Sequence, residues 1–230
     1  MAHQERIQEV VSFFGPPGSG KGTVVQEWHR RGMVQALSTG SLCRQHIKEQ
    51  TVHGKEFKQL LDKGLLIPDA LISAMVRDWL LANKTTAHTI LLDGYPRTQQ
   101  QVFQWDEMMR EAMDCVVYSV VLFEISDEAL IERLSQRLVC SDIRCQSVYA
   151  ATEGLVRCLN CESLLMRRHD DKPEVIAQRL VVYAGHKRAF LTACKERGIL
   201  VRVFNVEHVA LQDMFEQFLA VLYEKNGSAV

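Results

Sequence analysis

The sequence predicts an α/β fold with a central parallel sheet covered by helices on both faces. Short runs that are apolar at every position alternate with longer runs whose apolar residues recur at helical spacing. Such strands belong to parallel sheets, because the helices that connect them cover both faces of the sheet. In these sheets, ligands bind at the carboxyl ends of the strands. A length of 230 residues allows one well-buried core with appendages, or two small domains.

The expected elements follow in order along the chain. Four apolar runs predict strands at residues 10–14, 89–93, 116–124 and 200–206. Helical spacing predicts helices at 21–31, two or three within 41–81, and further ones at 98–113, 127–136, 173–197 and 211–222. Pro173 suits the first turn of its helix, since the N–H that it lacks would have no partner within that helix.

Composition excludes several classes of function. Apolar residues make up 47% of the chain and charged residues 24%, as in ordinary globular proteins. The formal net charge of -1 gives no overall field that would attract nucleic acid or an anionic membrane. The N-terminus is too polar for a signal peptide, and no stretch approaches 18 uninterrupted apolar residues. We expect a cytoplasmic monomer without nucleic-acid or membrane partners.

A glycine-rich segment connects the first predicted strand to the first predicted helix. Residues 15–23 read Gly-Pro-Pro-Gly-Ser-Gly-Lys-Gly-Thr. A phosphate needs convergent backbone N–H donors, which a tight glycine loop followed by a helix N-terminus supplies. Lys21 can reach the β- and γ-phosphates, and Thr23 can hold magnesium or a phosphate oxygen. The general motif places Ser or Thr directly after the lysine, whereas here Gly22 intervenes. A glycine turn with an exposed lysine is the alternative, but the flanking strand and helix favour a phosphate site.

With glycine after the lysine, this loop resembles that of adenylate kinases and related nucleoside monophosphate kinases. The resemblance runs from about residue 13 to residue 204 and rests on five motifs in the family's order. It implies a P-loop three-layer fold with a helical NMP-binding subdomain at 38–67 and a zinc-bearing lid at 137–171. The core domain would then comprise residues 1–37, 68–136 and 172–230.

The resemblance also implies the reaction ATP + AMP ⇌ 2 ADP with Mg²⁺, which balances the adenine nucleotides. On the donor side, it assigns ATP binding to Gly18, Ser19, Gly20, Lys21, Gly22, Thr23, Arg133, Arg137, Val148 and Tyr149.

Three segments match the family on the acceptor side. Residues 38–44 (STGSLCR) resemble STGDLLR, 62–69 (DKGLLIPD) resemble the stretch that closes the subdomain, and 91–98 (LLDGYPRT) resemble LLDGFPRT. The resemblance assigns AMP binding to Thr39, Arg44, Leu65, Ile67, Gly94, Arg97, Gln101, Arg168 and Arg179. Ser41 replaces the family's usual aspartate, which predicts weaker organisation of the water around magnesium.

Transfer between two nucleotides gathers several negative charges in one place. The phosphate of AMP is ionised at neutral pH, so the protein must align two anions and neutralise charge instead of supplying a general base. Matching the family's arginines, the expected catalytic residues are Lys21, Arg97, Arg133, Arg168 and Arg179. Magnesium would be held through water by Asp93, Thr23, Asp170 and Asp171. Each arginine taken singly also fits a solvated surface charge, and their joint occurrence favours the site.

Four of the seven cysteines cluster between residues 140 and 161. Cys140, Cys145, Cys158 and Cys161 have the spacing x4, x12 and x2, which fits a tetrahedral structural zinc site. Two disulfides, disfavoured in the cytoplasm, or four unliganded thiols are the alternatives. The family's metal-bearing lids usually have x2 in the first pair, so two residues are inserted here. A metal would stabilise a segment that has little core of its own.

Two other functions stay open from the sequence. A UMP/CMP kinase, or an AMP kinase that uses GTP, would keep the fold, but the long lid and Gln101 favour AMP as acceptor. Near the donor base, residues 205–208 read Asn-Val-Glu-His where the family has a glycine-containing turn, which leaves the donor base open. A zinc-ribbon binding module predicts basic and aromatic residues around the cysteines. Only four arginines and Tyr149 are near them.

Overall fold

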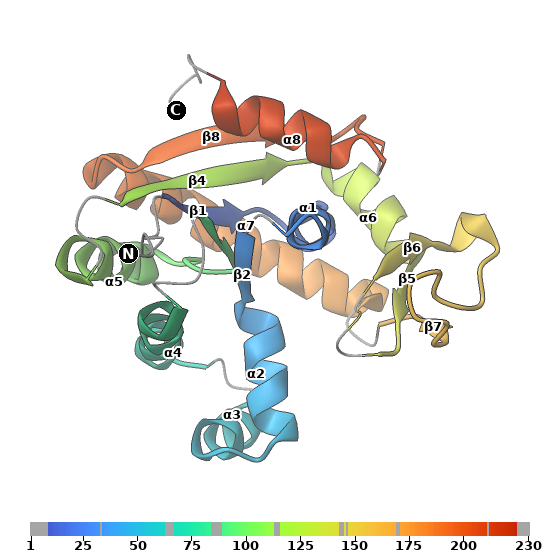
Figure 1. Cartoon of the computed structure of the whole chain (residues 1–230), viewed down its shortest axis with the longest axis horizontal. Coiled ribbons are helices and arrows are strands. Elements are labelled where there is room, and N and C mark those ends of the chain that lie inside the picture. The colour runs from blue at the N-terminus through green and yellow to red at the C-terminus, as the bar shows by residue number, and fades with distance from the viewer. Residues whose placement is uncertain are drawn as a thin grey trace, which may run out of the picture.

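The structure is a computed structural model, and it describes residues 9–32, 34–62, 67–83, 89–112, 116–142, 145, 147–168, 171–210 and 212–224. Its centre is a five-stranded parallel sheet with the order β2-β3-β1-β4-β8 (Figure 1). The strands are β1 (Glu9–Phe14), β2 (Val34–Ser38), β3 (Thr89–Asp93), β4 (Val117–Glu124) and β8 (Leu200–Asn205). The predicted parallel sheet is therefore confirmed.

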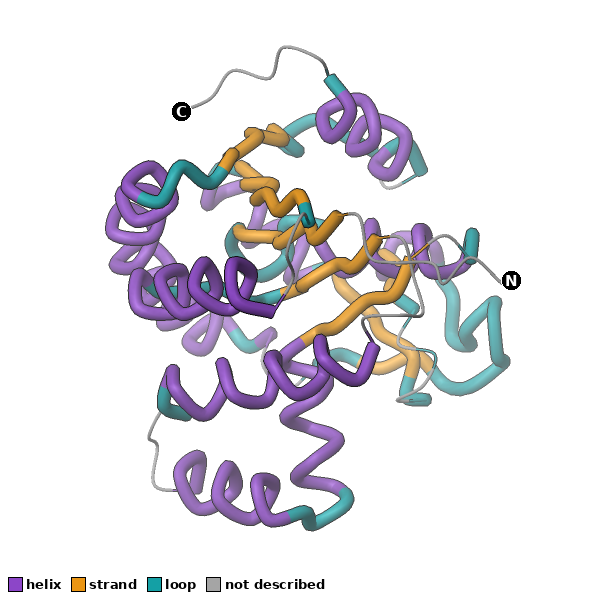
Figure 2. Tube along the Cα trace, turned by 60° about the vertical axis from the view of Figure 1, so that its left-hand side comes forward, coloured by secondary structure: helices purple, strands orange, loops and turns teal. Residues whose placement is uncertain are grey.

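Helices lie on both faces of this sheet and make three layers (Figure 2). One face carries α1 (Lys21–Arg30) and α8 (Met214–Tyr223), and the other carries α4 (Asp69–Asn83), α5 (Gln99–Ala112) and α7 (Pro173–Glu196). Among the described residues, no helix combines the length and the apolar character that crossing a membrane requires.

Strand β1 shows why the central strands are apolar at successive positions. Val10 and Phe14 pack into the core beneath α4, α5 and α7, whereas Val11 and Phe13 pack into the core beneath α1 and α8. Successive side chains of a strand point to opposite faces, so a sheet covered on both sides needs apolar residues at both sets of positions. Because β1 is buried on both faces, the glycine loop that follows it begins at the carboxyl edge of the central sheet.

Two groups of elements project from the central sheet (Figure 1). Helices α2 (Thr39–Lys48) and α3 (Val52–Asp62) follow β2 and pack on each other. Helix α6 (Asp127–Ser135) leads into a separate three-stranded antiparallel sheet with the order β6-β5-β7. Its strands are β5 (Arg137–Cys140), β6 (Val148–Ala150) and β7 (Leu165–Met166), and the short 3₁₀ helix Ala151–Glu153 follows β6. The exact subdomain boundaries stay a prediction.

The structure adds four strands that the sequence pattern did not predict. Strand β2 pairs with β3 at an edge of the sheet, and Val34 and Leu37 are buried in the cores on its two faces. Its sequence VQALS also has two polar residues, so it shows no continuous apolar run. The other three, β5 to β7, have between two and four residues each, too few to show a periodic pattern. The described C-terminal helix begins at Met214, and Leu211 lies outside the described residues.

Candidate active site

A large cleft opens at the carboxyl ends of the central strands, between α2 and the small sheet. Its volume is about 1730 Å³, and its walls come from the glycine loop, α2, the end of β3, α6, the small sheet and α7. Pockets for a single drug-sized ligand usually have about 300 to 1,000 Å³. The cleft therefore has room for two ligands of nucleotide size.

The glycine loop folds tightly at the floor of this cleft. Gly18 and Gly20 have φ angles of 88° and 92°, which side chains rarely adopt. A Cβ atom at Gly18 would also lie 2.8 Å from the side chain of Leu134. The Nζ atom of Lys21 donates to the carbonyl oxygens of Gly15 and Pro16 at 2.8 and 2.6 Å. The loop thus brings backbone groups, a helix N-terminus and a lysine to one place, as a phosphate site requires.

The surroundings of Lys21 are strongly electropositive. The pKa of its ammonium is lowered to about 7, mainly by burial; Asp93 opposes this shift, and Arg97, Arg179 and Arg137 contribute to it. An anion bound beside Lys21 would raise this pKa and favour the protonated ammonium, so the position is suited to binding a phosphate.

Six arginines from separate elements line the same cleft. They come from α2, the turn after β3, α6, β5, the segment after β7, and α7: Arg44, Arg97, Arg133, Arg137, Arg168 and Arg179. The structure thus brings together every arginine that the sequence nominated. Arg97 lies directly over the turn after β3, since a Cβ atom at Gly94 would be only 2.2 Å from its guanidinium.

Arg133 and Arg137 are held by partners from other segments of the chain. Nη2 of Arg133 donates to the carbonyl oxygens of Val206 and Val209 at 2.6 and 3.2 Å, and burial lowers the pKa of this arginine. Its buried Nη1 has no hydrogen-bond partner in the part of the chain that the structure describes. Arg137 makes a two-point ion pair with Asp171, with Nε and Oδ2 2.7 Å apart. The Asp171 carboxylate, predicted to bind magnesium through water, therefore contacts Arg137 here.

Two of the residues nominated for magnesium, Asp93 and Thr23, lie near the carboxyl ends of the central strands. Asp93 ends β3 opposite Phe13 of β1, and Thr23 lies in the first turn of α1. Both line the cleft, near Lys21. Ser41, which stands where the family has aspartate, accepts a hydrogen bond from Arg44 at 2.9 Å. Asp170 lies outside the described residues.

Several predicted acceptor residues do not line the cleft. Thr39 is buried and donates from Oγ1 to the carbonyl oxygen of Gly94 at 3.0 Å. Gln101 is 5% exposed, and its amide bonds to Asp69 and to the backbone N–H of Arg97. Ile67 is described but is not part of the cleft wall, and Leu65 lies outside the described residues. Their direct contacts with AMP stay a prediction.

The other residues nominated for ATP are close to their expected places. Gly18, Gly20, Gly22, Val148 and Tyr149 line the cleft, whereas Ser19 is buried within the loop and donates to the carbonyl oxygen of Pro16 at 2.9 Å. The cleft wall also includes Tyr183 and His186, which the sequence reasoning missed. Tyr183 lies one helical turn after Arg179 and His186 lies two turns after it. Their position on the same face of α7 as this arginine is the sequence signal that could have identified them.

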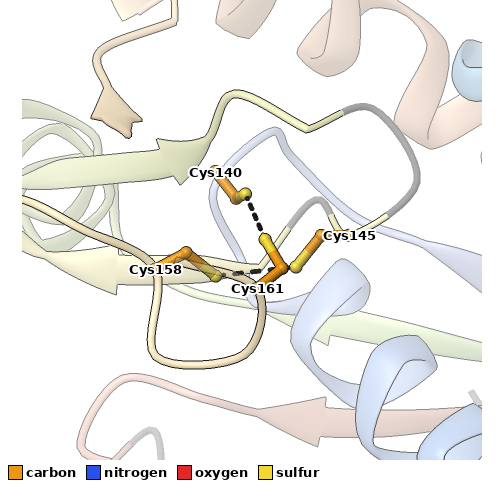
Figure 3. A group of neighbouring side chains, drawn as sticks. All are labelled: Cys140, Cys145, Cys158 and Cys161. Carbon is orange, nitrogen blue, oxygen red and sulfur yellow. Dashed lines mark hydrogen bonds between the residues drawn. The ribbon is translucent and has the colours of Figure 1, made fainter. Parts of the chain in front are cut away.

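The four clustered cysteines converge in the small sheet (Figure 3). Their sulfur atoms all lie within 4.8 Å of one another. The Cys140 and Cys161 sulfurs are 3.3 Å apart, and those of Cys145 and Cys158 are 3.6 Å apart. These distances exceed a disulfide bond of about 2.05 Å. They approach the roughly 3.8 Å separation that tetrahedral geometry with 2.3 Å zinc–sulfur bonds produces. The cluster therefore fits a tetrahedral metal ion.

Backbone groups support these sulfurs in the manner of zinc knuckles. The N–H groups of Asp142 and Asn160 donate to the sulfurs of Cys140 and Cys158, both at 3.4 Å. Burial raises the pKa of Cys140 to about 12. For Cys158, burial also acts to raise the pKa, but hydrogen bonds from Tyr149, Asn160 and Cys161 outweigh it and lower the pKa to about 6. A thiolate, which metals require, is thus favoured at Cys158.

Tyr149 connects the cysteine cluster with the cleft. Its hydroxyl lies 3.4 Å from the Cys158 sulfur and accepts the N–H of Leu159 at 3.0 Å. The same residue lines the cleft. Tyr149 therefore lies between the two sites, and Cys145 of the cluster lines the cleft as well.

Known proteins resemble this chain over most of its length. A statistical description of the family named Adenylate kinase matches residues 13–199. The adenylate kinase of Treponema denticola is 36% identical over 195 residues, which cover 83% of this chain and 89% of that protein. The adenylate kinase of Caldicellulosiruptor bescii is 33% identical, covering 85% and 91%, and that of Chlamydia pneumoniae is 32% identical, covering 94% and 98%. Because the match extends from β1 and the glycine loop, past the small sheet, to the end of α7, the chain belongs to the adenylate kinase family.

Proposed function

We propose that this chain transfers the terminal phosphoryl group of ATP to AMP, reversibly, giving two ADP. The observation that carries the proposal is the gathering of Lys21 and six arginines around one cleft with room for two nucleotides. A protein that bound a single mononucleotide would need neither so many guanidinium groups nor such a volume. The family membership supports the same activity.

The chemistry requires alignment and charge neutralisation. An oxygen of the AMP phosphate attacks the γ-phosphorus of ATP, and a bond forms to it as the bond from that phosphorus to the β-γ bridging oxygen breaks. No proton need move, because the attacking phosphate is already ionised. The glycine loop and Lys21 would hold the donor phosphates, with Arg133, Arg137, Val148 and Tyr149 on the donor side. The cationic side chains stabilise the charge on the transferring group.

On the acceptor side, the residues proposed to bind AMP are Thr39, Arg44, Leu65, Ile67, Gly94, Arg97, Gln101, Arg168 and Arg179. Arg44 and Arg97 line the cleft on the side of α2, which supports their assignment to the acceptor phosphate. Arg168 and Arg179 reach the cleft from the lid and from α7 and would bridge the two nucleotides.

Magnesium is the metal proposed for the donor nucleotide. Asp93 and Thr23 would hold it through water, with Asp170 and Asp171 from the lid, and the ion would neutralise charge on the phosphates. An oxygen-rich set beside a phosphate site suits this hard cation, which keeps several of its waters.

Zinc is the metal proposed for the four cysteines, with a structural role only. A set of four sulfurs leaves no open coordination position and therefore no catalytic one. Metal analysis of freshly purified protein is expected to find one zinc per chain. Protein that contains no zinc yet keeps a folded lid would contradict this assignment.

The two groups of elements that project from the central sheet would support this reaction by closing over the cleft as rigid units. We assign residues 38–67 to an acceptor subdomain and 137–171 to a lid, each carrying arginines of the cleft. The mutual packing of α2 and α3 and the separate sheet of the lid support this division. Closure of both would exclude water, which would otherwise compete with AMP for the phosphoryl group.

The cytoplasm is the proposed location, with a monomer as the working unit and ATP, AMP and ADP as partners. Clustered thiols that are not joined in disulfides suit a reducing compartment. Light scattering after gel filtration tests the oligomeric state.

One coupled assay tests the function directly. AMP, UMP, CMP and GMP are compared as acceptors, each with ATP or GTP as the donor. We expect AMP with ATP to give the highest kcat/KM. Preference for UMP or CMP would identify a pyrimidine kinase, and preference for GTP would reassign the donor site. Absence of transfer with every pair would refute the proposal.

A further inference from the structure

A carboxylate outside the cleft is bonded to the turn that carries Arg97. Asp69 begins α4, immediately after the proposed acceptor subdomain. Its Oδ2 accepts a hydrogen bond from Thr98 Oγ1 at 2.5 Å, and its Oδ1 accepts one from Gln101 Nε2 at 2.8 Å. The sequence reasoning gave this residue no role.

Asp69 determines which way the Gln101 amide points. A carboxylate can only accept hydrogen bonds, so it selects the NH₂ end of the amide. The amide oxygen then faces the backbone N–H of Arg97, from which it accepts a hydrogen bond at 2.8 Å. Because Gln101 is 5% exposed, water cannot easily replace these bonds.

Other contacts hold the rest of the same turn. Thr39 donates to the carbonyl oxygen of Gly94 at 3.0 Å, and Ser12 donates to that of Tyr95 at 2.6 Å. The guanidinium of Arg97 lies against Gly94, where even a Cβ atom would not fit. The Gln101 amide secures the backbone of Arg97 itself, so the direction in which this side chain leaves the turn depends on that amide.

We propose that Asp69 is a positioning residue for the acceptor phosphate. By fixing the Gln101 amide, it holds the backbone of Arg97 and so keeps the guanidinium over the acceptor part of the cleft. This inference rests on the proposed function, in which Arg97 binds AMP. Through its bonds to Thr98 and Gln101, Asp69 also connects the end of the proposed acceptor subdomain with the turn that carries Arg97.

Steady-state kinetics of three variants test the inference. Asp69→Ala removes both acceptors, and the KM for AMP is expected to rise about tenfold, with the KM for ATP within about twofold. Asp69→Asn is the conservative variant. Its Oδ1 can still accept from Gln101 and its Nδ2 can donate to Thr98 Oγ1, so it is expected to restore most of the affinity. Asp78→Ala, on the exposed part of the same helix, is the control and should change neither KM.

A double-mutant cycle tests whether Asp69 acts through Arg97. AMP affinity is measured by calorimetry for Asp69→Ala, Arg97→Ala and the double variant. Once Arg97 is removed, Asp69→Ala is expected to weaken binding much less than it does in the wild-type background, with only the part that acts through Gln101 itself remaining. Two fully additive losses would overturn the inference, as would an equal rise in both KM values.

Failure of this inference differs from failure of the proposed function. A wild-type protein without transfer to AMP refutes the function, whereas an active wild type with an unchanged Asp69→Ala variant refutes the inference alone. Where Asp69→Ala does not fold, Thr98→Val replaces it, because it removes the hydroxyl that donates to Oδ2; the same hydroxyl also accepts the backbone N–H of Gln101 at 3.1 Å. A selective rise in the KM for AMP is expected there too, and its absence would count against Asp69.

Discussion

Among single residues, Lys21 has the environment that most directly indicates phosphate binding. Its ammonium donates to carbonyl oxygens of its own loop and lies near three arginines. We expect Lys21→Met to leave the fold intact, as judged by circular dichroism, and to lower kcat by roughly 10²- to 10³-fold. The reason is that a neutral side chain cannot balance charge on the transferring group. Lys195→Met, on the exposed end of α7, is the control. Turnover like that of the wild type would remove Lys21 from the mechanism.

The same lysine predicts a proton linkage. With a pKa of about 7, mainly because of burial, Lys21 is largely neutral at pH 8. ATP phosphates beside it favour the charged form and raise the pKa, so binding should take up close to one proton at pH 8 and much less at pH 6. Calorimetry in two buffers with different ionisation enthalpies measures this uptake. Lys21→Met should abolish it, and uptake that persists in the variant must come from another group.

Single residues also separate what the sequence could predict from what it could not. The glycine loop and the arginines stand in recognisable local motifs, so their identity was available without coordinates. The contact of Asp171 with Arg137 and the amide orientation of Gln101 were not, because each depends on a partner more than thirty residues away in the chain. Motifs nominate side chains, whereas tertiary packing decides which atoms they face.

Among the elements, α2 and α3 meet at a crossing that only glycine allows. A Cβ atom at Gly54 would lie 1.8 Å from the carbonyl oxygen of His46. Gly54→Ala should therefore force the helices apart, destabilise the protein by about 1–3 kcal/mol and raise the KM for AMP more than that for ATP. Gly185→Ala in α7 is the matched control. It has no atom within 4 Å of the added Cβ, and should stabilise the helix by up to about 1 kcal/mol. Urea unfolding and kinetics of both variants measure the difference, and equal behaviour would show that the crossing tolerates a methyl group.

The lid offers a second test among the elements, at Tyr149. Its hydroxyl contacts the Cys158 sulfur. Mutation of groups that bond to metal ligands typically lowers metal affinity 10- to 100-fold. Tyr149→Phe should weaken zinc binding by about tenfold, measured by competition with a chromogenic chelator. Tyr118→Phe, whose hydroxyl bonds to Asp106 in the core, is the control. Unchanged zinc affinity in Tyr149→Phe would show that the hydroxyl does not support the cluster.

The predicted elements succeeded where burial imposes a strong pattern. Strands β1, β3 and β4 lie inside the sheet, so both their faces are apolar, and the ends of α6 and α7 carry local signals in Ser126 and Pro173. Strand β2 has only three apolar residues, Val34, Ala36 and Leu37, and the lid strands have two to four residues each, so neither carries a clear local pattern. For these elements, the information lies in contacts between segments and not in the local order of residues.

For the whole molecule, the distribution of charge matters more than its sum. The chain has 27 basic and 28 acidic side chains, Lys+Arg against Asp+Glu, so it is nearly neutral. The cleft nevertheless collects six arginines and Lys21. A cleft with low-dielectric walls focuses such a local field and attracts anions without making the whole surface basic. The overall charge therefore favours partners other than nucleic acid, which stays a prediction, but it could not reveal the phosphate site.

The lid and the core have separate sheets, and this separation predicts two unfolding events. Within the described residues, the lid strands pair with one another and not with the central sheet, while the three tryptophans, Trp28, Trp79 and Trp105, pack in or against the core clusters. Tryptophan fluorescence should therefore report only the core. Removing zinc with a chelator is expected to unfold the lid and abolish transfer, because the cysteine cluster supplies much of its stability. The tryptophan-reported Tm should fall by no more than a few degrees, while hydrogen exchange in the lid accelerates strongly. If the tryptophan transition instead fell together with lid protection, lid and core would form a single cooperative unit, and the lid could not move independently over the cleft.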